Sequence, residues 1–199
     1  MWVIGVTGGI ACGKSLAAAY WSEMGVAVCE ADTLAHEVME PGGEAYPYVV
    51  DAFGRDILRA DGAIDRKKLG KKVFASESER RVLNACVHPF VERAWKAWMR
   101  RQRERRTPMA VVVVPLLFEA YPKGWDAVVC VAAPAEWQME KLKERGLTAT
   151  EARQRIAAQW PLPDKIRKSD YVIFNAGSRE ALRQQVKRVT ERILENAHG

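Results

Sequence analysis

Residues 8–15 of this chain read Gly8-Gly9-Ile10-Ala11-Cys12-Gly13-Lys14-Ser15. The spacing fits the pattern G-x-x-x-x-G-K-[ST], whose backbone N–H groups surround phosphate oxygens. A short β-branched apolar run at 2–6 precedes the motif, and a helical pattern at 15–24 follows it. This strand–loop–helix context is the one in which the pattern marks a phosphate-binding loop, so we predict that the chain binds a nucleoside triphosphate.

The side chains and the helix that follow the glycines indicate how the phosphates are held. Lys14 can reach the β- and γ-phosphates, and the hydroxyl of Ser15 can bind Mg²⁺. The N-terminus of the helix adds a fixed positive potential at the same place. The residues expected to contact the nucleotide here are Gly8, Gly9, Ile10, Ala11, Cys12, Gly13, Lys14, Ser15 and Leu16.

Short apolar runs alternate with amphipathic segments along the rest of the chain. Further strands are predicted at 26–29, 110–114, 127–132 and 171–174, and helical patterns occupy 33–39, 77–106, 135–146, 148–159 and 178–196. We expect the helix at 77–106 to be interrupted near His88-Pro89, because proline has no N–H to donate. Strands separated by helices predict an α/β three-layer sandwich with a five-stranded parallel sheet.

Composition excludes several classes of protein. The 199 residues are 48% hydrophobic and 28% charged, so the chain can bury a core and is not a disordered tail. Its apolar runs are far shorter than the ~20 residues of a membrane span, and no signal peptide is evident. Four separated cysteines without a C-x-x-C pair argue against a zinc site and are typical of reduced thiols. We expect a cytoplasmic protein that does not bind membranes.

The charge of the chain favours an anionic partner. A net charge of +6 suits either a phosphorylated metabolite or nucleic acid, and does not distinguish them. The arginine-rich stretch at 100–106 is most simply the solvated end of a helix, where cations are favoured by the helix dipole. The alternative is a nucleic-acid-binding patch.

Asp32 follows the predicted strand at 26–29. Ligands collect at the carboxyl ends of parallel strands, and a carboxylate there can deprotonate an attacking hydroxyl or help to hold Mg²⁺. The alternative is an N-cap for a helix that starts at Thr33, and spacing alone does not separate the two. The chain has no N-K-x-D string and no acidic residue directly after 110–114, so the sequence favours a small-molecule kinase over a GTPase or a motor ATPase.

An ordered set of motifs extends through nearly the whole chain. Its members are Thr7-Gly8-Gly9-Ile10, Gly13-Lys14-Ser15, Ala31-Asp32, Ala35, Glu40-Pro41-Gly42, Phe53-Gly54, Asp61-Gly62, Asp65-Arg66, Leu69-Gly70, His88-Pro89, Pro115-Leu116-Leu117-Phe118-Glu119, Arg155-Ile156-Ala157-Ala158-Gln159, Lys165, Asp170, Asn175 and Gly177. Many families share the phosphate loop, whereas the ordered set is much more specific. Together these motifs resemble the dephospho-coenzyme A kinase family.

The resemblance implies a reaction and an architecture. ATP phosphorylates the 3′-hydroxyl of the ribose of dephospho-CoA, giving CoA and ADP in the final step of coenzyme A synthesis. One kinase domain then has three parts: a nucleotide-binding core at 1–32, 109–135 and 169–199, a helical CoA-binding region at 33–108, and a small helical lid at 136–168. The expected partner is dephospho-CoA, with no nucleic acid, and the chain is expected to be a monomer or a weak homo-oligomer.

The resemblance also implies roles for individual residues. Asp32 is the expected catalytic base and, with Ser15, a magnesium ligand, while Lys14 clamps the phosphates. Arg145 and Arg155 are the expected lid arginines that stabilise the transferring phosphoryl group. The other expected contacts are Asn175 and Gly177 with adenine, and His88, Pro89, Leu116, Leu117 and Phe118 with the acceptor.

Several of these residues have simpler interpretations. His88 could cap or pack, and the segment 116–118 could belong to the core. Arg145 could lie on a solvated face, and Arg155 could serve in a salt bridge. A cation cluster at 136–168 favours a lid that closes on ATP, and its members are Arg145, Arg153, Arg155, Lys165, Arg167 and Lys168.

Four positions depart from the usual family pattern. Ala11-Cys12 replace Gly-Ser, Glu30 replaces an aspartate, and Phe174 stands where a polar residue is common. Ala11 is strained only if its backbone is left-handed, and a helix N-terminus can lower the pKa of the Cys12 thiol. Because strand side chains alternate, residues 30 and 32 should share a face.

Two other functions stay open on the sequence. Another phosphate-loop kinase could act on a nucleoside or nucleotide instead of dephospho-CoA. A less favoured alternative is a nucleic-acid-binding protein that uses ATP as a switch.

Overall fold

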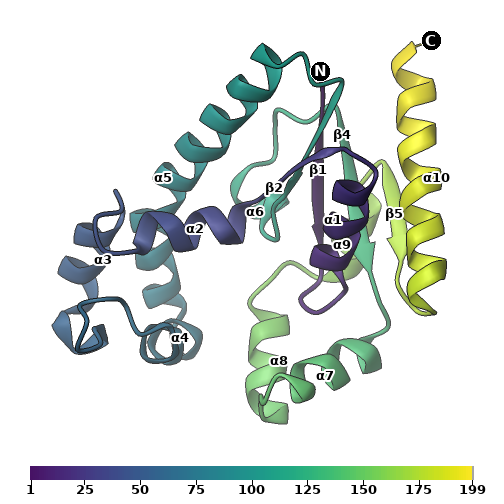
Figure 1. Ribbon diagram of the computed structural model, residues 1–199. Helices are drawn as coiled ribbons and strands as arrows, with labels where there is room; N and C mark the ends of the chain where they lie inside the picture. Colours follow the sequence, from purple (N-terminus) through teal and green to yellow (C-terminus); the bar gives the residue numbers. More distant parts are fainter. Residues whose placement is uncertain (199) are drawn as a thin grey trace. The chain divides into compact units, whose positions relative to one another are not determined.

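The computed structural model describes residues 1–198, and within them five strands form one sheet in which all neighbours are parallel. The strands are β1 (Trp2–Gly8), β2 (Ala27–Glu30), β3 (Met109–Val113), β4 (Ala127–Ala132) and β5 (Tyr171–Phe174). Their order is β2-β3-β1-β4-β5, so β1 lies in the centre (Figure 1). The prediction of a five-stranded parallel sheet is confirmed.

The sheet belongs to the first of two compact units, Met1–Glu30 with Met99–Gly199. The helices of this unit are α1 (Lys14–Glu23), α6 (Leu117–Ala120), α7 (Ala135–Glu144), α8 (Ala149–Ala157), α9 (Leu162–Lys168) and α10 (Arg179–His198). The predicted helices at 135–146, 148–159 and 178–196 are confirmed, with ends that differ by one or two residues.

Helices cover both faces of the sheet. Ile4 and Val6 of β1 are fully buried in one apolar cluster with side chains of α1 and α10. Because side chains alternate along a strand, Gly5 and Thr7 face the other way. On that face, α6 and α9 contact β1, and Leu117 of α6 packs on Gly5. The three-layer arrangement is therefore confirmed.

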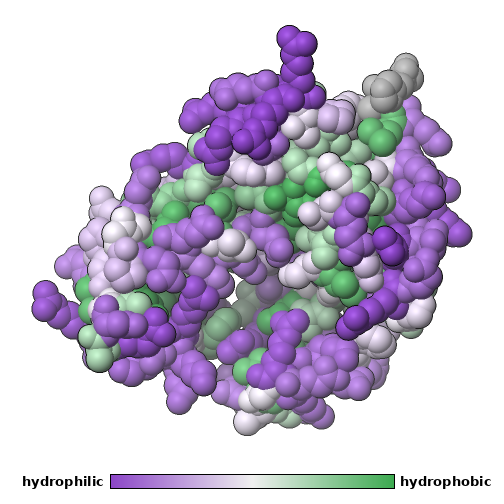
Figure 2. Space-filling view, in the orientation of Figure 1, coloured by the Kyte–Doolittle hydropathy of each residue, from purple (hydrophilic) through white to green (hydrophobic). Residues whose placement is uncertain are grey.

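The layer of α1 and α10 is held by apolar packing and one buried hydrogen bond. Leu182, Val186 and Ile193 bury the inner side of α10 at helical spacing. Trp21 of α1 donates its indole N–H to the hydroxyl of Thr190 at 2.8 Å. The outer side of α10 is hydrophilic (Figure 2). The amphipathic pattern of this helix thus matches its place at the edge of the core.

The second compact unit is Ala31–Trp98. It contains α2 (Ala31–Met39), α3 (Tyr46–Phe53), the 3₁₀ turn η1 (Arg55–Ile57), α4 (Arg66–Ala75) and most of α5 (Glu77–Glu104). Val49, Phe53, Ile57 and Leu69 are buried in it. Asp65 caps α4 by accepting the N–H groups of residues 67 and 68 at 2.9 and 3.1 Å. The assignment of this helical region to CoA binding stays a prediction.

Helix α5 continues through proline. It extends from Glu77 to Glu104 with Pro89 inside, so the expected interruption near residue 88 is wrong. Proline removes the N–H that would bond to the carbonyl of Ala85. Both Ala85 and Pro89 lie on the exposed side of the helix, where water can hydrate that carbonyl.

The surface is as polar as the charged content of the sequence leads one to expect. The face seen in Figure 2 is mainly hydrophilic, with scattered apolar patches. Among the described residues, no helix combines the length and the apolar character that crossing a membrane requires.

Candidate active site

The phosphate loop turns at its first and last required glycines. Gly8 has a φ of 142° and Gly13 a φ of 97°, conformations that L side chains rarely adopt. A Cβ on Gly8 would lie 2.0 Å from the carbonyl oxygen of Val131 in β4. Glycine is therefore needed at residue 8 both for the backbone conformation and for the close approach of the neighbouring strand.

The two phosphate-loop residues that depart from the family pattern, Ala11 and Cys12, behave differently from each other. Ala11 has a φ of 60°, so its backbone does lie in the left-handed region, which is strained for a residue with a Cβ. Cys12 is fully buried. Burial raises the pKa of its thiol, and the nearby charge of Lys14 only partly opposes this. The expectation of a lowered pKa is wrong, because desolvation outweighs the charge of Lys14 and the backbone hydrogen bonds at residues 9 and 133.

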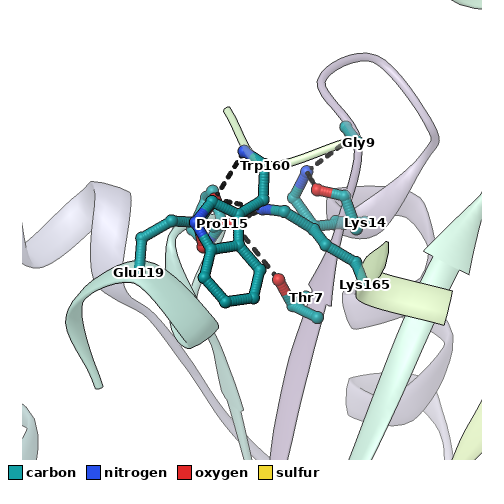
Figure 3. A network of polar contacts seen from close by, with 8 residues as sticks. Thr7, Gly9, Lys14, Pro115, Glu119, Trp160 and Lys165 are labelled. Carbon is teal, nitrogen blue, oxygen red and sulfur yellow. Dashed lines mark hydrogen bonds and ion pairs between the residues drawn. The ribbon is translucent and has the colours of Figure 1, made fainter. Parts of the chain in front are cut away.

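Lys14 begins α1 and folds back over the loop. Its Nζ donates to the carbonyl oxygens of Gly8 at 3.2 Å and Gly9 at 2.8 Å (Figure 3). The ammonium group thus already lies at the positive end of α1, where the loop backbone can also bind an anion. An arriving phosphate oxygen would find a cation in place and would need only a local movement of this side chain.

Ser15, in the first turn of α1, contacts a carboxylate of β2. Its Oγ donates to Oε2 of Glu30, the last residue of β2, at 3.1 Å. A hydroxyl and a carboxylate are the oxygen ligands that Mg²⁺ prefers, so this pair fits a hard divalent cation. Among the side chains that the structure describes, no group of three or more His, Cys, Asp or Glu could hold a metal, so phosphate oxygens would have to complete such a site.

The chain changes from strand to helix between Glu30 and Asp32. β2 ends at Glu30 and α2 begins at Ala31. Residues 30 and 32 therefore do not alternate along one strand, and the expectation that they share a strand face is wrong. Asp32 is exposed in the first turn of α2 and is not an N-cap for a helix starting at Thr33. A carboxylate in a first turn is stabilised by the helix dipole.

Two buried amide side chains hold the loop from outside. Asn175, which follows β5, is 8% exposed and donates Nδ2 to the carbonyl of Cys12 at 3.1 Å. Gln138 of α7 is 5% exposed and donates Nε2 to the carbonyl of Ile10 at 2.7 Å. Gln138 was not among the residues expected from the sequence. The sequence feature that could have identified this residue is a glutamine on the apolar side of a helix, four residues before the buried Leu142.

A buried ion pair lies beside the loop. Lys165 of α9 is fully buried, and its Nζ lies 2.8 Å from Oε1 of Glu119, which is 17% exposed. The same Nζ donates to the carbonyl of Pro115 at 2.7 Å, and the hydroxyl of Thr7 donates to that carbonyl at 3.1 Å (Figure 3). The backbone N–H of Trp160 donates to Glu119 at 3.0 Å. Lys165 is therefore not an exposed lid cation. The expected cluster of lid cations is wrong for this residue.

The comparisons with known proteins agree along nearly the whole chain. The family model for dephospho-CoA kinase matches residues 2–181. The chain belongs to the dephospho-CoA kinase family. A dephospho-CoA kinase of Geobacillus kaustophilus is 46% identical over 185 residues, which cover 92% of each chain. One from Thermosynechococcus vestitus is 44% identical over 186 residues, which cover 92% of this chain and 90% of that one.

The fold is also similar to solved structures. The crystal structure of TT1252 from Thermus thermophilus superposes with a TM-score of 0.78 at 30% identity. The match covers 96% of this chain and 97% of that chain. The three-layer arrangement and the order of its elements are thus those of a known protein of similar length.

Of the three residues at 116–118 that the dephospho-CoA kinase resemblance assigned to the acceptor, one belongs to the core. Leu117 is fully buried, and a Cβ on Gly5 would lie 2.6 Å from its Cδ1. Leu116 and Phe118 are half-buried. The ring of Phe118 stacks on Trp160, with centroids 6.2 Å apart and planes inclined by 19°. Acceptor contacts of Leu116 and Phe118 stay predictions.

The remaining residues assigned by family resemblance lie on other helices or in a loop. Arg145 is exposed at the end of α7, and Arg155 is half-buried on α8. His88 is half-buried inside α5, where burial lowers the pKa of its imidazole, and Pro89 is exposed. Gly177 is exposed before α10. The roles of these residues stay predictions.

Proposed function

We propose that this chain transfers the γ-phosphoryl group of ATP to the 3′-hydroxyl of dephospho-CoA, giving CoA and ADP. Membership of the dephospho-CoA kinase family supports the acceptor. The observation that carries the phosphoryl-transfer chemistry is the phosphate loop, whose backbone is set by Gly8 and Gly13 and which Asn175 and Gln138 support from outside. A rigid loop of N–H groups with a lysine across it binds a triphosphate without large rearrangement.

The proposed mechanism depends on positioning and charge rather than on covalent catalysis. Lys14 and the loop N–H groups hold the β- and γ-phosphates. Asp32 orients the ribose hydroxyl and accepts its proton as the bond to phosphorus forms. Arg145 and Arg155 stabilise the negative charge that spreads over the transferring phosphoryl group.

We further infer a magnesium site at Ser15. A bound Mg²⁺ would neutralise negative charge on the triphosphate. Ser15 and Glu30 would hold the ion or its water, together with Asp32. The hydrogen bond from Ser15 to Glu30 supports this, because a hydroxyl that donates its proton to a carboxylate keeps its lone pairs for a cation. Ser15 and Asp32 were expected magnesium ligands from the sequence, and we add Glu30 because of its hydrogen bond with Ser15.

An assay of ADP release tests the proposed acceptor. Dephospho-CoA is expected to stimulate ADP release from ATP, and ³¹P NMR of the product is expected to show a new phosphate monoester on the 3′-oxygen. Nucleosides and nucleotides tested at the same concentration are expected to have no effect. Stimulation by a nucleoside and not by dephospho-CoA would contradict the proposal and favour another kinase activity.

Asp32→Asn tests the proposed base. Loss of a general base is expected to lower kcat by about 10²-fold or more, while the Kd for ATP changes little. Glu37→Gln is the matched control, because Glu37 is an exposed carboxylate of the same helix, about 140° around its axis from residue 32. Equal turnover of Asp32→Asn and wild type would remove Asp32 as the base.

A mobile lid is also part of the proposal. Helices α7 and α8 carry Arg145 and Arg155, and closure over ATP would exclude water from the transfer step. ATP is then expected to protect residues 136–168 from proteolysis. The cytoplasmic location, the absence of a nucleic-acid partner and the monomeric or weakly associated state stay predictions of the sequence.

A further inference from the structure

We propose that Lys165 and Glu119 form a positioning pair, which fixes the segment 115–119 against the end of β1 so that the acceptor is aligned with the phosphate loop. The inference rests on the proposed kinase function and goes beyond it, because neither residue was assigned a role there. The pair acts through other groups, so its members are positioning residues and not catalytic ones.

The contacts of Lys165 join three separate segments of the first unit. From α9, its Nζ reaches Glu119 at 2.8 Å and the carbonyl of Pro115 at 2.7 Å. That carbonyl also accepts the hydroxyl of Thr7 at 3.1 Å, one residue before the phosphate loop begins at Gly8. Figure 3 shows these groups meeting beside Lys14. The Pro115 carbonyl therefore joins α9, through the buried ammonium group, to the strand that carries the phosphate site, through Thr7.

Glu119 makes the second half of the link. Its Oε1 accepts both the ammonium of Lys165 and the backbone N–H of Trp160. The ring of Trp160 stacks on Phe118, which the family resemblance places at the acceptor. The pair thus holds the backbone on both sides of a stacked aromatic contact, at residues 115 and 160.

The energetics argue against a purely stabilising role. A buried ion pair is often no more stabilising than two apolar side chains of similar volume, because both charges lose their hydration. Oε2 of Glu119 is buried and has no hydrogen-bond partner among the described residues, which adds a further desolvation cost to the pair. The pair makes directional hydrogen bonds to two backbone groups, and two apolar side chains could not make such bonds.

Direct action on the phosphates is not supported by the geometry. Lys165 is fully buried and is neutralised by Glu119, whereas Lys14 lies on the loop itself. The role that remains is to set the position of the segment 115–119, and displacement of a reacting group by about 1 Å can lower a rate by about 10²-fold.

Two variants separate positioning from stability. Lys165→Met alone leaves the largely buried carboxylate of Glu119 without its cation, so the Tm of this variant should fall. Lys165→Met combined with Glu119→Leu removes both charges, and its Tm should recover most of that loss. We expect kcat/KM for dephospho-CoA to stay about 10- to 100-fold below wild type in the double variant, with the Kd for ATP little changed. The matched control is Arg183→Met with Glu23→Leu, an exposed pair 3.0 Å apart between α10 and α1, which should leave activity unchanged.

A second comparison applies even if the double variant does not fold. Glu119→Gln can still accept from Lys165 and Trp160, whereas Glu119→Met cannot. Activity is measured per folded molecule, with the folded fraction taken from circular dichroism. We expect Glu119→Gln to keep a clearly higher kcat/KM than Glu119→Met.

Two results would overturn the positioning pair while leaving the kinase proposal intact: recovery of Tm and kcat/KM together in the double variant, or equal kcat/KM in Glu119→Gln and Glu119→Met. Absence of dephospho-CoA phosphorylation by the wild-type protein would instead overturn the proposed function. The two failures are therefore distinguishable.

Discussion

Ala11→Gly should stabilise this protein, although alanine-to-glycine changes usually destabilise. Ala11 has a φ of 60°, a conformation that disfavours an L residue by about 1–2 kcal/mol. Glycine removes that strain but gains conformational freedom in the unfolded chain, which offsets about 0.5–1 kcal/mol. The net expectation is a gain of about 0.75 kcal/mol in the free energy of unfolding, within a range of about 0–1.5 kcal/mol.

Ala19→Gly is the matched control. Ala19 is exposed in the middle of α1, eight residues along the same segment, with ordinary helical backbone. There, glycine is expected to destabilise by about 1 kcal/mol. Urea unfolding followed by circular dichroism measures both variants, and a change of 1 kcal/mol corresponds to about 2–4 °C in Tm for a chain of this size. If both variants lose stability equally, the strain argument at residue 11 is refuted.

Two further predictions concern the loop support and the pH dependence of stability. Asn175→Ala removes the buried hydrogen bond to the Cys12 carbonyl, and a lost bond of this kind, about 1–3 kcal/mol, should raise the Kd for ATP at least about fivefold. Measuring the Kd for inorganic tripolyphosphate as well as for ATP decides the role of Asn175. If Asn175→Ala weakens the binding of both ligands, the residue supports the loop. If it weakens the binding of ATP alone, the residue contacts adenine. Burial lowers the pKa of His88 below 6.5, so the unfolded chain binds more protons there and stability should fall as the pH decreases through 6.5. His88→Gln should flatten the fall of Tm between about pH 7 and pH 5, and an unchanged slope would contradict this assignment.

Local patterns in the sequence were enough to predict the sheet and the phosphate loop. The runs at 110–114 and 127–132 are continuous and apolar because central parallel strands are covered on both faces. The motif at 8–15 depends on backbone geometry that glycine permits within a few residues, so its function could be inferred without knowing any distant contact. Helix ends and the continuity of α5 through Pro89 were less predictable, because solvent exposure of one helix side decides whether a lost hydrogen bond is tolerated.

The sequence by itself determined the α/β fold, the phosphate loop and, through its ordered motifs, the family. Tertiary structure alone decided which side chains surround that loop. Lys165 belongs to a cation-rich segment of the sequence, yet the packing of α9 on β1 and β4 buries it opposite Glu119. Gln138 and Asn175 reach the loop from 128 and 163 residues away along the chain. Burial and pairing between distant segments depend on how the layers pack, and no local pattern of residues contains that information.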